Sequence, residues 1–345
     1  MSDPFSRPSI ADYVNALQAT KYPTDVAARP TGYTLLLYSS ASDPSYASRG
    51  LSANVYANPE TGKIIISYLG PVTSANDLAG VYVDPVLLAA AKAVNQRIAV
   101  NDETLTPEMQ NVVRDFIGEV GNKAQAAGYS FTNSNVFVTG NSEGALFTQL
   151  SAKIFGFGGT TFGGVPIPGT TSNDAPLDSR LDNYYYALDP IGNLGTDRAI
   201  GPQGTGTQYH YGNDIMIGKI SDSAFLADAA RMALSPGNED LSATLATAKL
   251  FFDVSVYHPF TSYAKTLGVN LNKPQTVSEV DLSVMPDAAI FLDKSGGAIS
   301  GSISWDANNK PTLTLSYSRR RVRAGGWRRA RGASTNMACI RKRFA

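Results

Sequence analysis

One short segment constrains the fold of this chain more than any other. Residues 135–139 are an apolar run typical of a buried strand, residues 140–144 read Gly-Asn-Ser-Glu-Gly, and residues 145–155 have the composition of a helix. A strand that passes directly into a helix needs a tight turn, and larger side chains than glycine would collide there with the neighbouring strand and helix. The pattern predicts that Ser142 lies at the carboxyl edge of a sheet, in front of a helix N-terminus. The alternative is a glycine-rich turn without chemistry.

The segments around this turn alternate between two kinds of element. Short apolar or alternating runs predict strands at residues 33–39, 52–57, 63–69, 160–165, 184–188 and 215–217. Composition or helical spacing predicts helices at residues 81–100, 106–128, 222–234 and 240–252, with Thr106 as the N-cap of the second. Strands that alternate with helices indicate an α/β fold with a central, mostly parallel sheet flanked by helices.

Composition divides the chain into four parts. Residues 1–30 are a polar N-terminal extension with a short helical stretch, residues 31–279 hold the α/β domain, and residues 280–318 are a short β-rich C-terminal extension of the same domain. Residues 319–345 carry nine Arg and one Lys and no acidic residue, so we expect a basic, disordered tail. The tail leaves residues 1–318 with 19 basic against 29 acidic side chains.

Charge and cysteine content exclude several kinds of protein. An acidic body is a poor binder of nucleic acid, because phosphate contacts need concentrated Lys and Arg. One Cys rules out internal disulfides and thiolate metal cages, and two His leave little room for a zinc enzyme with histidine ligands. No apolar run reaches the roughly 18 residues of a membrane-spanning helix. We therefore expect no cofactor, no metal, no nucleic-acid partner and no stable membrane insertion.

The start of the chain lacks the basic and apolar regions of a Sec signal peptide. We expect a soluble protein, and the sequence does not indicate its compartment. Export by a route that needs no signal peptide is one of the alternatives.

A serine hydroxyl is a weak nucleophile unless a base activates it. In elbow folds the partners follow in the order serine, acid, histidine. The chain has two histidines, His210 and His258, and both follow Ser142. His258 lies in a loop-like Tyr-His-Pro context, where a base can reach the turn, whereas His210 lies in an alternating strand, where a buried structural imidazole is the usual outcome. The residues favour His258 and leave His210 as the alternative.

The acid should follow a later strand. The predicted strand at residues 184–188 ends in Asp189-Pro190, which places Asp189 where such an acid belongs, although an aspartate there could also simply cap a turn. Weaker candidates for the acid are Asp182, Asp197 and Asp253.

From about Tyr33 to Tyr263 the chain resembles a class 3 lipase of the α/β-hydrolase superfamily. Residues 136–144 resemble that family's strand and nucleophile elbow, and Asp189-Pro190-Ile191 resembles its Asp-Pro-Val motif. Residues 209–217 resemble its Tyr-x-His-x-Gly strand, in which the histidine is usually structural. The spacing is also similar to that of secreted bacterial lipases and phospholipases exported without an N-terminal signal.

The resemblance implies a catalytic triad. Ser142 would be the nucleophile, Asp189 the orienting acid, and His258, with Tyr263 five residues on, the general base and then acid.

Two backbone N–H groups should bind the oxyanion of the tetrahedral intermediate. One should come from Glu143 and the other from the loop after residues 63–69, where Gly70 or Val72 could donate, or Leu69 if the loop is displaced. Pro71 has no N–H, and the family usually has Arg-Gly-Thr at this loop. The acidic Glu143 beside the nucleophile favours neutral esters over anionic substrates.

Residues 81–100 lie where the resembled family has a lid. Their apolar stretch could cover an acyl pocket and open at a lipid surface, or it could be a plain core helix. The substrate-binding or lid residues that we predict are Leu69, Val86, Leu87 and Leu88.

These observations predict a serine carboxylic-ester hydrolase, a lipase or esterase that acts on triacylglycerol or another neutral ester through a Ser-His-Asp triad and an acyl-enzyme. Its partner would be a lipid or other ester, met at a lipid–water interface. The alternatives are a phospholipase or polyesterase of the same fold and, from a different class, an inactive hydrolase-fold binding or effector module.

Overall fold

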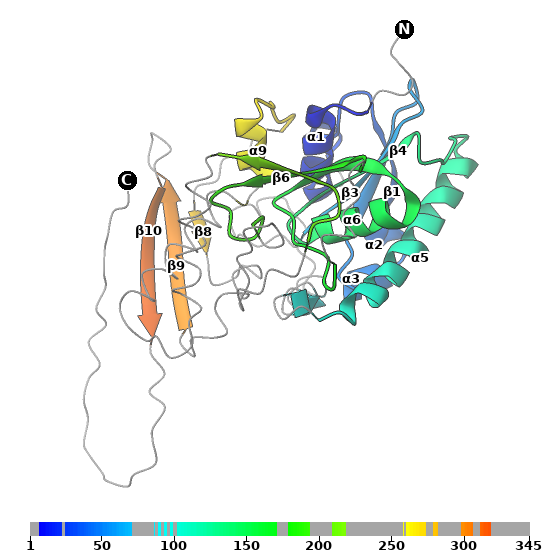
Figure 1. Cartoon of the computed structure of the whole chain (residues 1–345). Coiled ribbons are helices and arrows are strands. Elements are labelled where there is room, and N and C mark those ends of the chain that lie inside the picture. Colours follow the sequence, from blue (N-terminus) through cyan, green and yellow to red (C-terminus); the bar gives the residue numbers. More distant parts are fainter. Residues whose placement is uncertain are drawn as a thin grey trace, which may run out of the picture.

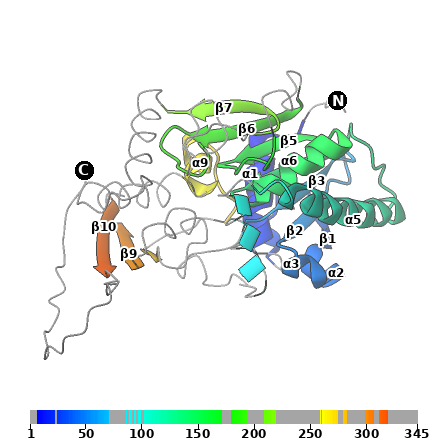
Figure 2. The ribbon, with the colours of Figure 1, turned by 60° about the horizontal axis from the view of Figure 1, so that its bottom comes forward.

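Seven strands form one sheet in the order in which they occur along the chain (Figures 1 and 2). The computed structural model describes residues 7–22, 25–70, 86, 89–90, 93–94, 97–98, 102–170, 179–193, 209–218, 258, 260–273, 279–281, 298–305 and 311–318. The strands are β1 (Thr34–Tyr38), β2 (Ala53–Ala57), β3 (Ile64–Tyr68), β4 (Val136–Asn141), β5 (Gly158–Phe162), β6 (Leu181–Tyr186) and β7 (Asn213–Ile217).

The sheet is antiparallel from β1 to β3 and parallel from β3 to β7. The carboxyl ends of five strands therefore meet at one edge, where ligands bind in open α/β sheets. The predicted α/β-hydrolase-like fold, with a mostly parallel central sheet, is confirmed. The strands expected around the elbow and on both sides of it are present within a few residues of their predicted bounds.

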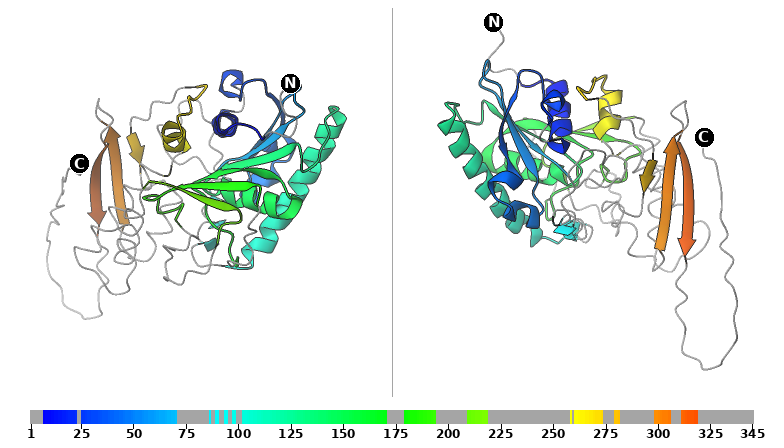
Figure 3. Two further views of the ribbon diagram at one scale, coloured as in Figure 1. Left: turned by 45° about the horizontal axis from the view of Figure 1, so that its top comes forward. Right: turned by 180° about the vertical axis from the view of Figure 1, so that it is seen from behind.

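Helices cover both faces of the sheet because side chains alternate along each strand. The main helices are α1 (Ile10–Lys21), α5 (Leu105–Ala126), α6 (Gly144–Phe155) and α9 (Phe260–Thr266). On β3, Ile64 and Ile66 pack in the core cluster that includes α5 and α6, whereas Ile65 packs in the cluster that includes α1 and α9. Figure 3 shows α1 (blue) and α9 (yellow) on one side of the sheet and α5 on the other.

Short helical turns lie between the first strands. They are η1 (Val26–Ala28) before β1, and α2 (Ser39–Ser42) and α3 (Ser45–Ser48) between β1 and β2. At the start of the described chain, Ser9 caps α1 through a reciprocal pair of hydrogen bonds with Asp12, which satisfies backbone donors that a helix otherwise leaves open.

The first helix is bonded to the segment that follows α9. Gln18 is fully buried, and its side-chain oxygen accepts a hydrogen bond from the backbone N–H of Lys273 at 2.9 Å, while its amide donates to the carbonyl of the same residue. Asn15 accepts from the backbone N–H of Asn272 at 2.8 Å. The domain boundary at residue 30 stays a prediction, and α1 shares a core cluster with Tyr263 of α9.

A second, three-stranded antiparallel sheet stands apart from the first (Figure 1). Its strands are β8 (Glu279–Asp281), β9 (Ala298–Trp305) and β10 (Pro311–Ser318). This sheet is the β-rich C-terminal extension that the alternating sequence predicts. The helices predicted at 222–234 and 240–252 and the basic tail lie outside the described residues.

Two local predictions are wrong. The N-cap of α5 is Thr104, not Thr106. Thr106 is the second residue of the helix, and its hydroxyl donates to the carbonyl of Pro168 at 2.8 Å. His210 precedes β7 instead of lying within a strand. None of the helices in the described part of the chain combines the length and the apolarity needed to cross a bilayer.

Candidate active site

The turn between β4 and α6 is strained at a single residue. Ser142 has φ 57°, and within the described ranges it is the one residue other than glycine with positive φ. A left-handed backbone costs a non-glycine residue about 1–2 kcal/mol, and such strain clusters at functional sites. The turn holds the side chain of Ser142, which is 5% exposed, at the carboxyl edge of the sheet. This is the geometry of a nucleophile elbow.

The flanking glycines are required because the backbone segments nearly touch. A Cβ on Gly140 would lie 2.3 Å from the hydroxyl oxygen of Thr148, and one on Gly144 would lie 2.4 Å from the carbonyl oxygen of Tyr68. Both distances are far below any van der Waals contact, so strand, turn and helix close only with glycine at both positions. The two glycines in the sequence therefore explain why the turn can be this tight.

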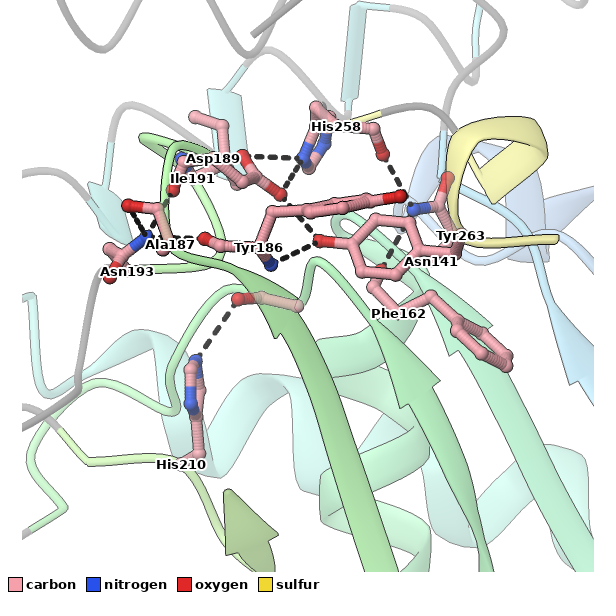
Figure 4. Close-up of polar contacts among 11 residues, drawn as sticks. Asn141, Phe162, Tyr186, Ala187, Asp189, Ile191, Asn193, His210, His258 and Tyr263 are labelled. Atoms are coloured by element: carbon pink, nitrogen blue, oxygen red, sulfur yellow. Dashed lines mark hydrogen bonds and ion pairs between the residues drawn. The ribbon is translucent and has the colours of Figure 1, made fainter. Parts of the chain in front are cut away.

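Asp189 and His258 form a buried pair although 69 positions separate them (Figure 4). Nδ1 of His258 lies 3.0 Å from Oδ2 and 3.1 Å from Oδ1 of Asp189. The Asp189 side chain is fully buried, and His258 is 4% exposed. Because Nδ1 faces the carboxylate, Nε2 lies on the opposite side of the ring. A carboxylate that faces Nδ1 can hold an imidazole in one tautomer and one orientation.

The carboxylate of Asp189 has further donors. The backbone N–H of Ile191 donates to Oδ1 at 2.9 Å, and the hydroxyl of Tyr263 donates to Oδ2 at 2.9 Å. Asp189 therefore also caps the turn that follows β6. The same side chain makes both the turn-capping contact and the contact with the imidazole. The charge is fully hydrogen-bonded, which is the condition for keeping it inside the protein.

Tyr263 is the donor that sequence reasoning left without a role. Burial raises the pKa of its hydroxyl well above the usual value, and the neighbouring charge of Asp189 raises it further. The group therefore stays protonated and donates to Asp189 while it accepts from the backbone N–H of Tyr186 at 3.2 Å. The only signal in the sequence is its place five residues after His258.

The backbone after β5 leaves no room beside the pair. Gly163 has φ +56°, and a Cβ there would lie 2.6 Å from Oδ2 of Asp189, 2.9 Å from the hydroxyl of Tyr263 and 3.0 Å from Nδ1 of His258. The acid, the base and the tyrosine thus pack directly against the end of a central strand. Sequence reasoning gave this glycine no function.

The elbow itself contacts His258. Asn141, the last residue of β4 and the neighbour of Ser142, donates from its carboxamide to the carbonyl oxygen of His258 at 3.3 Å and to that of Phe162 at 2.8 Å (Figure 4). The structure therefore brings the predicted acid, the predicted base and the strand end that carries the predicted nucleophile to the same edge of the sheet.

His210, the alternative base, is engaged elsewhere. Its Nδ1 lies 3.1 Å from Oδ1 of Asp214, and its Nε2 lies 3.0 Å from the carbonyl oxygen of Gly164. Desolvation by burial lowers the pKa of His210, but the charge and hydrogen bond of Asp214, together with the carbonyl of Gly164, outweigh it and raise the pKa above its ordinary value. Both ring nitrogens face acceptors, so His210 is the buried structural imidazole that the residues indicate.

One weaker candidate for the acid also has its own partners. Asp182 pairs with Arg7 at 2.9 Å and accepts from the carboxamide of Asn213 at 3.1 Å. Asp197 and Asp253 lie outside the described residues.

Gly70 lies directly against the elbow. A Cβ on Gly70 would lie 3.1 Å from Cβ of Ser142 and 3.3 Å from the backbone nitrogen of Glu143, so the two backbones pass within contact distance. A bulkier residue than glycine would separate them. Val72, the other predicted donor, lies outside the described residues.

The predicted substrate-binding residues fall in different surroundings. Leu69 is buried, and Val86 lies in a helical segment with its side chain 52% exposed. Leu87 and Leu88 lie outside the described residues. Further along the same stretch, Val94 and Ile98 are buried in the core cluster, and the lid stays a prediction.

Within the described ranges, no three His, Cys, Asp or Glu side chains gather as a set of metal ligands.

Comparisons with known proteins add little to this geometry. No protein-family model matches the sequence, and no curated protein matches it. Among solved structures, the chain is similar to the crystal structure of Lip2 lipase from Yarrowia lipolytica, with a TM-score of 0.36 and 12% identity over 60% of this chain and 77% of that one. A likeness this weak decides nothing about the chemistry of the chain, which follows from the contacts of its own residues.

Proposed function

We propose that the chain is a serine carboxylic-ester hydrolase. The observation that carries the proposal is the buried Asp189–His258 pair, which is bonded to the strand end whose next residue, Ser142, has the strained backbone of a nucleophile elbow. Strain of this kind persists only where surrounding structure fixes it, and it is common where a side chain must be presented for reaction. The resemblance of the sequence motifs to class 3 lipases supports the same assignment.

The reaction uses His258 twice. The hydroxyl oxygen of Ser142 attacks the ester carbonyl while Nε2 of His258 takes the hydroxyl proton, and Asp189 stabilises the imidazolium that forms. The tetrahedral intermediate collapses as the imidazolium gives its proton to the leaving alcohol, which leaves an acyl-enzyme on Ser142. His258 then takes a proton from water, the hydroxide attacks the acyl-enzyme, and the proton returns to Ser142 as the acid leaves.

The oxyanion of each tetrahedral intermediate needs donors that are already in place. We assign one to the backbone N–H of Glu143, which follows the nucleophile and precedes α6, and the other to Gly70, which packs against the elbow. The N-terminus of α6 adds a favourable field for the developing negative charge. Val72 and Leu69 are the remaining candidates for the second donor.

The proposed substrate is a neutral ester. The side chain of Glu143, the residue after the nucleophile, is 1% exposed, and its Oε1 lies 3.3 Å from where a Cβ on Gly50 would be, so its carboxyl group is buried in the protein. In its ionised form this carboxyl opposes an anionic acyl group or head group by like-charge repulsion. Triacylglycerols and simple esters meet this condition better than anionic lipids.

The test combines a covalent probe with turnover. A fluorophosphonate should label the wild-type chain and should not label Ser142→Ala. The same variant should lose all measurable hydrolysis of a p-nitrophenyl ester, while its thermal unfolding is unchanged. The matched control is Ser130→Ala, an exposed serine that follows α5, which should behave as wild type. A folded wild-type chain that is neither labelled nor active would overturn the proposal and leave an inactive hydrolase-fold module.

A further inference from the structure

We infer that Asn141 is a positioning residue that sets the place of the base relative to the nucleophile. Its carboxamide ties the backbone of His258 to the end of β4, and the next residue on that strand end is Ser142. The inference rests on the proposed function, because it concerns the geometry of the same reaction.

Both hydrogens of the Asn141 carboxamide are in use. One goes to the carbonyl of Phe162 at 2.8 Å and the other to the carbonyl of His258 at 3.3 Å, and Asn141 is 9% exposed (Figure 4). The carbonyl of Phe162 also accepts from the backbone N–H of Ser142 at 3.3 Å. The carboxamide therefore joins three pieces of backbone: the elbow, the end of β5 and the residue that carries the base.

Asp189 and Asn141 contact His258 at different places, and each contact restrains a different motion. Asp189 binds the ring at Nδ1, which fixes the rotation of the imidazole, and Asn141 binds the main-chain carbonyl, which fixes where the ring starts from. A contact at the ring does not by itself fix the position of the main-chain carbonyl. With both contacts, Nε2 has a defined place relative to the strand end of the nucleophile.

The chemistry at position 141 suits this task because both partners are carbonyl oxygens. An amide nitrogen offers two donors and no charge, so it satisfies two buried acceptors at once. A carboxylate of the same shape would place oxygens against those carbonyls, and an apolar side chain would leave both without this donor.

Position matters for rate as well as for stability. A misplacement of 1 Å between reacting groups can cost roughly a hundredfold in rate, and a site must be held to within about 0.5 Å. Loss of the Asn141 contact should therefore lower kcat and leave KM near its wild-type value, since the carboxamide is bonded to the main-chain carbonyls of Phe162 and His258. A purely structural bond between β4 and β5 would lower the melting temperature without this split.

The decisive experiment is a double-mutant cycle between positions 141 and 258. Asn141→Ala should lower kcat on a p-nitrophenyl ester, and the rate of fluorophosphonate labelling, by about tenfold to a hundredfold. In a His258→Ala background the same substitution should cause no further loss, because the ring through which Asn141 acts is gone. The matched control is Asn54→Ala, a fully buried carboxamide on β2 that donates to the hydroxyl of Tyr56 at 2.8 Å, which should lower stability and spare kcat.

Each outcome decides. Equal losses in both backgrounds, or an unchanged kcat in Asn141→Ala, would overturn the inference while the wild-type chain stays active. An inactive, unlabelled wild type would instead overturn the proposed function. If Asn141→Ala does not fold, Asn141→Ser, which keeps one donor, takes its place in the cycle with the same expected non-additivity.

Discussion

The hydroxyl of Tyr263 donates a hydrogen bond to Oδ2 of Asp189 at 2.9 Å from a position with no exposed surface. The same carboxylate oxygen lies 3.0 Å from Nδ1 of His258, so the tyrosine and the base share one acceptor. The tyrosine thereby draws part of the negative charge away from the imidazole, and it also links the acid to the backbone of β6 through Tyr186.

We expect Tyr263→Phe to move the pH profile of the enzyme. Without the donor the carboxylate presents more negative charge to His258, which favours the imidazolium form and shifts the acidic limb of kcat/KM to higher pH. The free energy of unfolding should fall by about 1.5–3 kcal/mol, the usual value of a hydrogen bond to a charged group. Steady-state kinetics between pH 5 and 9, at roughly the range where an imidazole titrates, would measure the shift.

Tyr56→Phe is the matched control for this substitution. Tyr56 is also buried and hydrogen-bonded, to Asn54 on the same strand, but it lies in β2 away from the site. It should lower stability and leave the profile in place. A profile that is identical in Tyr263→Phe and wild type would show that the tyrosine only fills space.

Gly163→Ala should abolish activity. The added Cβ would meet the acid, the tyrosine and the base within 3.0 Å, so the Asp189–His258 pair could not keep its geometry. Gly62→Ala is a close control, because Gly62 has φ +69° and nothing within 4 Å of a built Cβ. Both variants should lose about 1–2 kcal/mol of stability to backbone strain, and only Gly163→Ala should lose fluorophosphonate labelling. Labelling of Gly163→Ala at the wild-type rate would contradict this account of the site.

His210 should make stability depend on pH. Its pKa is raised in the folded state, so its contribution is fully present below the unfolded value of about 6.5 and is lost as pH rises through the folded value. The groups that face the ring are Asp214 and the carbonyl of Gly164, with the charge of Asp189 more remote. Urea unfolding from pH 6 upward should show wild-type stability falling towards that of His210→Gln. Parallel curves for the two proteins would rule the imidazolium out.

Local pattern was enough to predict the elbow. The apolar run of β4, the two glycines and the start of α6 lie within a few positions of one another, and steric exclusion at Gly140 and Gly144 leaves little choice of turn. The order of acid and base along the chain also follows from the elbow topology. The contact between Asp189 and His258 does not follow from that order, because the sequence gives no distance between the two side chains.

Asn141 and Tyr263, which sequence reasoning left without a role, contact residues far along the chain. Asn141 contacts a carbonyl 117 positions later, and Tyr263 reaches Asp189 74 positions earlier. Neither contact leaves a periodic trace in the sequence, since each depends on which strand ends become neighbours. Thr104, the N-cap of α5, makes no side-chain hydrogen bond to the helix.

The bonds between α1 and residues 272–273 bear on how the protein is made. Gln18 and Lys273 are 255 positions apart, so the first helix leaves the ribosome long before the segment that it binds. Contacts of such large sequence separation form late, and apolar surface that waits for them is exposed to aggregation. We expect a nascent chain that ends before residue 260 to remain dependent on chaperones, and the proposed activity to arise only after nearly the whole domain has been synthesised.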